Sequence, residues 1–393
     1  MADIKKLAQQ YTDYMVESRR WYHRHPELTE HEEKTTEAIV ADLEAMGLSP
    51  QRFEGMYGCV AELKGAKPGK TVMLRADIDA LPVHEKTGLP FASENEGKMH
   101  ACGHDAHIAI GLGAAKILTS LKDELCGTVK FFFQPAEELA LGAKGGVERG
   151  IMEGVDAVYG THVWGQLDAG KINFDHGERM ASCDFFTLTI KGEACHGSAP
   201  QLGHDAVVAA SAVIMALQTI VSRVNDPRNS LVLTTGTFDA GQRFNIIADK
   251  AVMDGTVRTF NPEFRMKIEG LIRKMAEDVA RGYGCTAELK YNYLCPAVIN
   301  ADDKVTDTAI NAVKKLFGEE ALGAFEKLTG SEDFSFLMEK APGVYGFIGS
   351  RSAEVPGSGQ SNHHECYTVD EKIIPMGAAT AAQFAFDFCS DKE

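Results

Sequence analysis

Short apolar runs that alternate with helical segments constrain the fold of this chain more than any other feature. Four runs have the length and composition of buried strands: Cys59–Leu63, Thr71–Ala76, Thr128–Gln134 and Ala157–Val163. Apolar residues at helical spacing predict a helix over Leu7–Met46, which Gly47 ends, and another over His107–Leu121. This alternation is typical of the α/β class, so we expect a mostly parallel sheet sandwiched between helices.

The order of the elements changes near residue 181. From there the sequence predicts strand, helix, strand, strand, helix and strand, over Phe185–Lys191, Ala206–Val221, Val232–Asp239, Lys250–Thr259, Pro262–Tyr283 and Thr286–Tyr293. This β-α-β-β-α-β order is that of the ferredoxin-like unit. Because 393 residues exceed the roughly 250–300 at which one core stops growing, two domains are expected. We predict a larger domain of residues 1–180 and 296–393 and an inserted unit of residues 181–295.

Charge and composition restrict the partners. A formal net charge of −16 opposes binding to nucleic-acid phosphates, which basic side chains must neutralise. The longest apolar segment, Ala206–Val221, is about four residues short of the roughly 20 that span a bilayer, so we predict a buried helix and no membrane partner. The first residues show no signal-peptide pattern, and nine scattered cysteines do not suggest a disulfide framework. We expect a cytoplasmic protein whose partners are small molecules or metals.

A dense group of metal-binding side chains lies just before the second predicted helix. The segment His100–His107 contains Cys102 and three histidines within eight residues. Thiolate and imidazole at this density suit zinc or a neighbouring first-row divalent ion. Two other interpretations stay open: a solvated His-rich turn, and a metal-free hydrolase in which His104 activates Cys102 as a nucleophile.

Carboxylate pairs follow two of the predicted strands, where open α/β sheets place their ligand sites. Asp77 and Asp79 stand at i and i+2 of an extended segment, so both point the same way and can bind a metal or orient a ligating histidine. Glu137 and Glu138 are adjacent and can diverge, one as a metal ligand and the other as a general base. The alternative for either pair is a charged surface loop.

The remaining candidate histidines are less specific. His162 follows a predicted strand, and a histidine in such a place is more often structural than a ligand. In the segment Ser361–Tyr367, either His363 or His364 can act as a ligand. In the inserted unit, His196 lies among turn-forming residues and can donate a hydrogen bond to a developing oxyanion, or can be an ordinary loop residue.

Taken together, these motifs resemble those of the aminoacylase and hippurate hydrolase family of co-catalytic metallopeptidases, in the branch with plant auxin-conjugate hydrolases and bacterial N-acyl-L-amino acid amidohydrolases. The resemblance covers nearly the whole chain. It rests on His100-Ala-Cys102-Gly-His104-Asp105, Asp77-Ile-Asp79, Gln134-Pro-Ala-Glu137-Glu138, Gly160-Thr-His162, His196-Gly-Ser-Ala-Pro200 and Ser331-Glu-Asp333-Phe. The chain departs from the family at Leu139-Ala-Leu141-Gly142 and lacks Ser-Pro after its last histidine motif, which leaves the substrate open.

The resemblance implies two divalent metal ions per chain, which can be manganese, zinc, nickel or cobalt. The implied ligands are Cys102, His104, Glu138, His162 and His363, with the Cys102 thiolate between the two ions. His363 is preferred to His364 because Tyr367 and Val369-Asp370-Glu371 match the downstream half of the family motif. Asp77 and Asp79 would orient the metal-binding side chains without contacting the metals themselves.

The resemblance also implies roles around the metals. Glu137 corresponds to the general base, and His196 to the group that stabilises the oxyanion. Asn245 and Arg258 stand at positions where the family contacts substrate. The larger domain would then be catalytic, and the inserted unit a lid that also pairs subunits into a homodimer or homotetramer.

The implied reaction is metal-dependent hydrolysis of the amide bond of N-acyl L-amino acids, acetyl or benzoyl for example, by a metal-activated water. Alternatives within the same chemistry are a specialised deacetylase of an N-acetyl diamino acid or of N-acetylcysteine, and a small-peptide peptidase. A non-enzyme alternative is a catalytically silent metal- or amino-acid-binding protein. The presence of both Glu137 and Glu138 speaks against it, because a binding site has no use for a positioned base.

Overall fold

The computed structural model describes residues 3–391, which separate into two compact units. The larger unit comprises the described residues of Met1–Arg179, Ile299–Glu326 and Asp333–Glu393, and the smaller comprises Met180–Val298 and Lys327–Glu332. The segment Lys327–Glu332 was expected in the larger domain from the sequence. It groups with the smaller unit because the backbone N–H of Ala181 donates to the carbonyls of Leu328 and Gly330.

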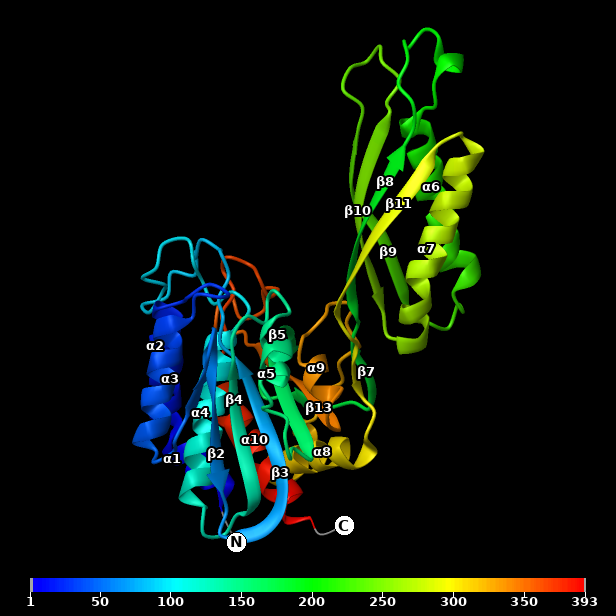
Figure 1. Ribbon diagram of the computed structural model, residues 1–393. Helices are drawn as coiled ribbons and strands as arrows, with labels where there is room; N and C mark the ends of the chain where they lie inside the picture. The colour runs from blue at the N-terminus through cyan, green and yellow to red at the C-terminus, as the bar shows by residue number, and fades with distance from the viewer. Residues whose placement is uncertain (1–2, 392–393) are drawn as a thin grey trace. The chain divides into compact units, whose positions relative to one another are not determined.

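The larger unit is built on a seven-stranded sheet (Figure 1). The strand order is β1 (Gln51–Phe53), β2 (Met56–Lys64), β4 (Cys126–Gln134), β3 (Lys67–Asp77), β5 (Ala157–Asp168), β13 (Gly343–Arg351) and β6 (Ile172–Asn173). The four central strands β4, β3, β5 and β13 are parallel, whereas β2 and β6 pair antiparallel with their neighbours. The predicted mostly parallel sheet is confirmed, with antiparallel strands added at its two edges.

Helices cover both faces of this sheet. Neighbouring residues of a strand point to opposite faces, and Phe132 and Phe133 of β4 contact different helices. Gly111 of α4 (His104–Ser120) packs against Phe133, and Gly146 of α5 (Gly142–Glu148) packs against Phe132. The two helices therefore lie on opposite faces, which explains why the last six residues of β4 are all buried.

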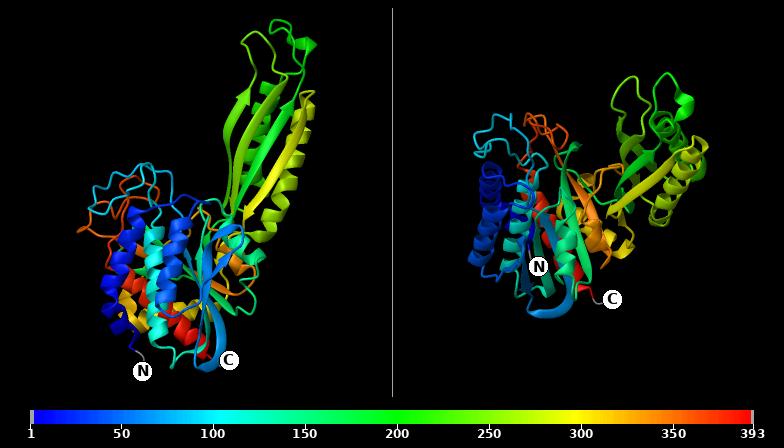
Figure 2. Two further views of the ribbon diagram at one scale, coloured as in Figure 1. Left: turned by 60° about the vertical axis from the view of Figure 1, so that its left-hand side comes forward. Right: turned by 45° about the horizontal axis from the view of Figure 1, so that its top comes forward.

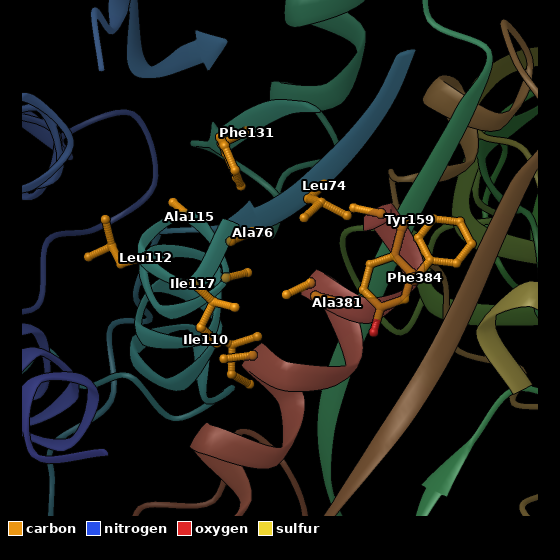
Figure 3. Packing of buried hydrophobic residues seen from close by; sticks show 14 of the residues in the cluster. Leu74, Ala76, Ile110, Leu112, Ala115, Ile117, Phe131, Tyr159, Ala381 and Phe384 are labelled. Atoms are coloured by element: carbon orange, nitrogen blue, oxygen red, sulfur yellow. The ribbon is translucent and has the colours of Figure 1, made fainter. Parts of the chain in front are cut away.

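The main core lies between the sheet, α4 and α10 (Ile373–Ser390). Figure 3 shows Leu74 and Ala76 of β3 near Ile110 of α4 and Ala381 of α10, and all four side chains are buried. Burial of apolar surface at roughly 25 cal/mol per Å² is the chief stabilising contribution of such a layer. This core fixes the sheet against α4, and the first residue of α4 is the candidate metal ligand His104.

The remaining helices of the larger unit are α1 (Ile4–Gln10), α2 (Thr12–Arg24), α3 (Glu33–Ala45), α8 (Asp303–Phe317) and α9 (Ser335–Met338), with a short 3-10 turn at Glu319–Ala321. The single helix predicted over Leu7–Met46 is wrong, since the chain forms three helices there. Pro26 accounts for the main interruption, because proline lacks an N–H and restricts the preceding His25. The chain also turns at Tyr11.

The smaller unit has the predicted ferredoxin-like order of elements. These are β8 (Cys183–Lys191), α6 (Ala206–Thr219), β9 (Leu231–Ala240), β10 (Lys250–Thr259), α7 (Pro262–Gly282) and β11 (Thr286–Cys295). The antiparallel sheet has the order β11-β8-β10-β9, and α6 and α7 pack together on it (Figures 1 and 2). A 3-10 turn, Pro200–Leu202, precedes α6. The strands β7 (Gly177–Met180) and β12 (Val298–Asn300) pair where the chain passes from one unit to the other.

The apolar helix of the smaller unit is buried on one face only. With the π-turn Ile220–Val224 that follows α6, it is long and apolar enough to cross a membrane by length and composition alone. Ala209, Val213 and Leu217 pack into the core, but Val208 is 48 % exposed and Met215 is 71 % exposed. The prediction of a buried helix is therefore wrong for its outer face, where apolar side chains reach the surface.

Candidate metal centre

The candidate ligands of the larger unit gather where the parallel strands end. Asp77 is the last residue of β3, and the segment that carries Glu137 and Glu138 follows β4 directly. His162 lies on β5, and His104 begins α4. Residues far apart in the sequence thus meet near the carboxyl ends of the parallel strands, as expected for ligand sites of open α/β sheets.

Cys102 belongs to two separate groups of potential ligands. Ligand atoms of Cys102, His104 and His162 lie within 4.8 Å of one another, and so do those of Cys102, Glu138 and His363. The Cys102 Sγ atom is 3.3 Å from Nε2 of His162, and Nε2 of His363 is 3.4 Å from Oε1 of Glu138. One thiol shared by two groups is the arrangement that a thiolate between two metal ions requires.

The chemistry of these groups fits bound cations. Nε2 of His104 is buried and has no hydrogen-bond partner among residues 3–391, which is costly unless a ligand satisfies it. Hydrogen bonds with Cys102 and Glu138 raise the pKa of His363 to about 10, so this position favours positive charge. Sulfur, imidazole and carboxylate donors together suit first-row divalent ions.

Asp79 orients two of the candidate ligands. Nδ1 of His104 donates to the backbone oxygen of Asp79 at 2.9 Å and lies 3.3 Å from its Oδ1, which turns Nε2 of His104 towards the ligand group. The backbone N–H of Glu138 donates to Oδ2 of Asp79 at 3.1 Å. Burial alone would raise the pKa of Asp79, but the hydrogen bond and charge of His104, together with hydrogen bonds from Thr29 and Glu138, lower it.

Asp77 acts mainly through His107. Nδ1 of His107 makes a short hydrogen bond with Asp77, and its Nε2 accepts from the backbone N–H of Val163 at 2.9 Å. Ligand atoms of Asp77, His104 and His107 also lie close together, but both ring nitrogens of His107 are already engaged. Burial would raise the pKa of Asp77, yet Arg75 and the two histidines hold it well below its usual range. We therefore interpret His107 as a support for β5 next to His162.

The other residues of the His-rich segment divide by geometry. Nδ1 of His162 donates to the carbonyl of Val163 at 2.7 Å, which leaves its Nε2 facing Cys102. His100 is buried, and neither of its ring nitrogens has a hydrogen-bond partner among the described residues. Burial lowers the pKa of His100 to about 4, so it is neutral at pH 7, and it belongs to none of the ligand groups found in residues 3–391.

The two adjacent glutamates, Glu137 and Glu138, lie within a tight turn. Ala136 and Ala140 have positive φ angles of 54° and 56°, and the backbone N–H groups of Leu141 and Gly142 both donate to the carbonyl of Ala136. A side chain at Gly142 would lie 1.6 Å from the carbonyl oxygen of Pro135, so only glycine fits there.

This turn gives the two acids different surroundings. Glu138 joins the group of Cys102 and His363, while a carboxylate oxygen of Glu137 lies within 4.8 Å of ligand atoms of both Glu138 and His104. Glu137 is thus next to the ligands without belonging to either group that shares Cys102. This is the position that a general base needs.

The geometry separates His363 from His364. His363 has φ 71°, donates its backbone N–H to the carbonyl of Ala101 at 2.8 Å, and turns its ring to Glu138. The ring of His364 instead accepts from the backbone N–H of Cys366 at 3.0 Å. The structure therefore favours His363, the residue that the sequence comparison with the family also prefers.

The smaller unit holds the other predicted residues. His196 pairs with Ile246 in a β-bridge, and the N–H of Gly197 donates to the carbonyl of Asn245 at 2.8 Å, so His196 and Asn245 lie in adjoining backbone segments. Arg258 lies on β10 and donates to Oγ of Ser331 at 2.8 Å.

Two acidic side chains accept hydrogen bonds from the backbone of other segments and were not assigned a role from the sequence. Asp333 accepts hydrogen bonds from Gln134 and Arg75 and from the N–H of Ala143, which fixes the end of β4 and the start of α5. Glu32 accepts from the N–H of Ala136, beside Glu137. The family motif around Asp333 gave a signal for the first, whereas no local pattern marks Glu32.

The sequence and structure are similar to known proteins over almost the entire chain. The model of "Peptidase family M20/M25/M40" matches residues 73–387, which include all five candidate ligands. The N-acetylcysteine deacetylase of Bacillus subtilis (strain 168) is 39 % identical over 94 % of this chain and 96 % of that protein. The Arabidopsis thaliana IAA-amino acid hydrolase ILR1-like 4 is 38 % identical over 95 % of this chain and 86 % of that protein.

A solved structure agrees with these sequence matches. The Bacillus subtilis YXEP protein, described as a dinuclear metal binding peptidase from the M20 family, superposes with a TM-score of 0.86 at 36 % identity. The match covers 97 % of this chain and 99 % of that one. The chain therefore belongs to peptidase family M20/M25/M40.

Proposed function

We propose that this protein is a metal-dependent amidohydrolase that releases free amino acids from N-acyl L-amino acids. The observation that carries the proposal is the position of Cys102 in two ligand groups, with Glu137 next to them. Relatives named as N-acetylcysteine deacetylase and IAA-amino acid hydrolase support an acylated amino acid as the substrate class.

In this proposal Cys102 would contribute its thiolate to both ion sites. His104 and His162 would hold one ion with it, and Glu138 and His363 would hold the other. Manganese, zinc, nickel and cobalt all accept this donor set. Two divalent ions, when bound, would lower the pKa of a water towards about 7 and polarise the acyl carbonyl.

The side chains of the protein then move and stabilise charge. Glu137 accepts the proton of the attacking water and returns it to the leaving amine. His196 donates a hydrogen bond from Nε2 to the oxyanion of the tetrahedral intermediate. Arg258 and Asn245 bind the polar groups of the amino acid, because a guanidinium and an amide suit a carboxylate.

A substrate panel tests this function. N-acetyl- and N-benzoyl-amino acids are incubated with the metal-loaded enzyme, and free amino acid is measured, with unacylated dipeptides and tripeptides in parallel. We expect release from the acylated amino acids to be fastest. Faster cleavage of the peptides would replace the proposal with a small-peptide peptidase.

A narrower candidate is deacetylation of N-acetylcysteine. Two Bacillus subtilis relatives, 39 % and 37 % identical to this chain, carry that activity in their names. A value of kcat/KM for N-acetylcysteine at least ten times that for N-acetylmethionine would support this narrower specificity.

We further propose that two copies of the chain associate through the smaller unit. Strand β9 is at the edge of its sheet, and apolar residues of α6 such as Val208 and Met215 are exposed. Met215→Lys should then shift sedimentation towards the monomer, whereas Met266→Lys, at an exposed position of α7, should not. A wild-type monomer would contradict this proposal. A reducing compartment keeps a thiol such as Cys102 available as a ligand, so we propose that the protein is cytoplasmic.

A further inference from the structure

Glu32 is a buried carboxylate that belongs to no ligand group of the candidate metal centre. It precedes α3, and its side chain is not exposed to solvent. Its Oε1 accepts a hydrogen bond of 2.8 Å from the backbone N–H of Ala136, 104 residues further along the chain. Its Oε2 has no hydrogen-bond partner among residues 3–391.

The residue that Glu32 holds has an unusual backbone conformation. Ala136 has φ 54°, a left-handed conformation that residues with a side chain rarely adopt. Its carbonyl accepts from Leu141 and Gly142 on one side, and its N–H donates to Glu32 on the other. Without that acceptor, a buried N–H would be left unpaired, and the strained conformation would lose one of its restraints.

We propose that Glu32 is a positioning residue for Glu137. Ala136 immediately precedes Glu137, so the peptide that Glu32 anchors sets the direction in which the Glu137 side chain leaves the turn. A misplacement of about 1 Å at a catalytic group can lower turnover about 100-fold. The catalytic consequence rests on the proposed function, whereas the anchoring of Ala136 does not.

Glu32 is itself held in place by Thr36, which also bonds to strand β2. Oγ1 of Thr36 donates to the backbone oxygen of Glu32 at 2.6 Å and accepts from the N–H of Gly58, in β2, at 2.8 Å. Burial and the nearby Asp79 raise the pKa of Glu32 to about 7. The amide oxygen of a glutamine is also a hydrogen-bond acceptor, so it should replace the carboxylate in the bond to Ala136.

The chain offers matched variants for a test. Glu32→Gln keeps an acceptor for Ala136, whereas Glu32→Met keeps the length of the side chain without one. Glu27→Met is the control, because Oε2 of Glu27 also accepts a backbone N–H at 2.8 Å, but from Thr35 in α3 and not from the turn that carries Glu137.

The first readout is hydrogen exchange of the peptide that spans residues 135–142, followed by mass spectrometry on the metal-loaded protein. Glu32→Met should speed exchange of this peptide at least tenfold, while Glu32→Gln and Glu27→Met leave it close to wild type. Unchanged exchange in a folded Glu32→Met protein would overturn the proposal. If that variant does not fold, faster exchange in Glu32→Ala or Glu32→Leu decides in the same way.

The second readout separates positioning from the function itself. Glu32→Met should lower kcat 10- to 100-fold with KM and metal content unchanged, and Glu32→Gln should restore kcat to within about threefold of wild type. Faster exchange with a wild-type kcat would overturn the proposal. If the wild-type protein hydrolyses no acylated amino acid, the proposed function fails, and hydrogen exchange still decides whether Glu32 anchors the turn.

Discussion

The backbone N–H of Ser198 donates a hydrogen bond to Nδ1 of His196 over 3.1 Å, and Oγ of Ser198 lies 2.7 Å from the same nitrogen. A ring nitrogen that accepts from an amide carries no proton, so the proton of neutral His196 is on Nε2. Because His196 is exposed, this N–H can donate to a substrate. The structure thus fixes the tautomer that an oxyanion donor needs.

We predict that His196→Ala lowers kcat by about 100- to 1,000-fold, the usual effect of losing one oxyanion donor. KM should change much less, since the interaction forms in the transition state. The control is His204→Ala, another exposed histidine of the smaller unit, which should keep wild-type kcat. Steady-state kinetics on an N-acyl amino acid measure both, and equal effects of the two variants would exclude the assigned role.

Metal analysis of two adjacent histidine variants tests the ligand set. His363→Ala should lose one of the two ions, because only His363 lies beside Cys102 and Glu138. His364→Ala should retain both, since its ring is bound to the N–H of Cys366. Elemental analysis after dialysis gives the metal content per chain. If His364→Ala alone lost metal, His364 and not His363 would be the metal ligand in this loop.

Cys183 should be unusually reactive at neutral pH. A hydrogen bond with Cys295 and the nearby Arg258 guanidinium lower the pKa of Cys183 to about 6. A lowered pKa means that the reactive thiolate is the main form above pH 6 and is lost below it. Alkylation by iodoacetamide, followed by peptide mass spectrometry, should therefore reach half its maximal rate near pH 6.

The buried Cys59 is the control for this measurement. Burial raises the pKa of Cys59 to about 12, so the folded protein should leave it unmodified across the same pH range. An alkylation rate at Cys183 that rises only above pH 8, as for an ordinary thiol, would contradict the predicted thiolate.

The buried ion pair of the smaller unit should contribute strongly to stability. Arg265 and the hydroxyl of Tyr291 both donate to Asp184, whose side chain is fully buried. Arg265→Leu leaves the charge of Asp184 without its partner, so we expect unfolding free energy to fall by about 3–5 kcal/mol.

Urea unfolding of the full chain measures this loss. The control is Arg228→Leu at the exposed pair of Arg228 and Asp226, which should have no measurable effect because solvent screens it. Similar losses in the two variants would show that burial of the pair does not matter.

Much of the fold follows from local sequence patterns. The runs Thr71–Ala76 and Thr128–Gln134 lie inside β3 and β4, because strands buried on both faces need continuous apolar sequence. The element order of the smaller unit could likewise be predicted from turns and periodicity. The dense His100–His107 segment pointed to the candidate metal centre, although only Cys102 and His104 of this segment lie in the ligand groups that share Cys102.

Features that depend on distant contacts could not be predicted. The anchoring of Ala136 by Glu32 joins positions 104 residues apart, and neither position carries a distinctive motif. The exposed face of α6 was hidden because its apolar residues occur on all sides of the helix, so periodicity does not show which side packs. Pro26, by contrast, is visible in the sequence, and the single helix expected over Leu7–Met46 gave it too little weight.

The most direct test is to measure amide hydrolysis and metal content together. A chelator removes the metals, manganese or zinc is restored separately, and release of free amino acid from N-acetyl- and N-benzoyl-amino acids is assayed for the wild type and Glu137→Gln. We predict no release without metal, recovery with two ions per chain, and a Glu137→Gln protein that binds both ions but turns over about 100- to 10,000-fold more slowly. Hydrolysis that survives complete metal removal, or wild-type turnover in Glu137→Gln, would contradict the two-metal mechanism.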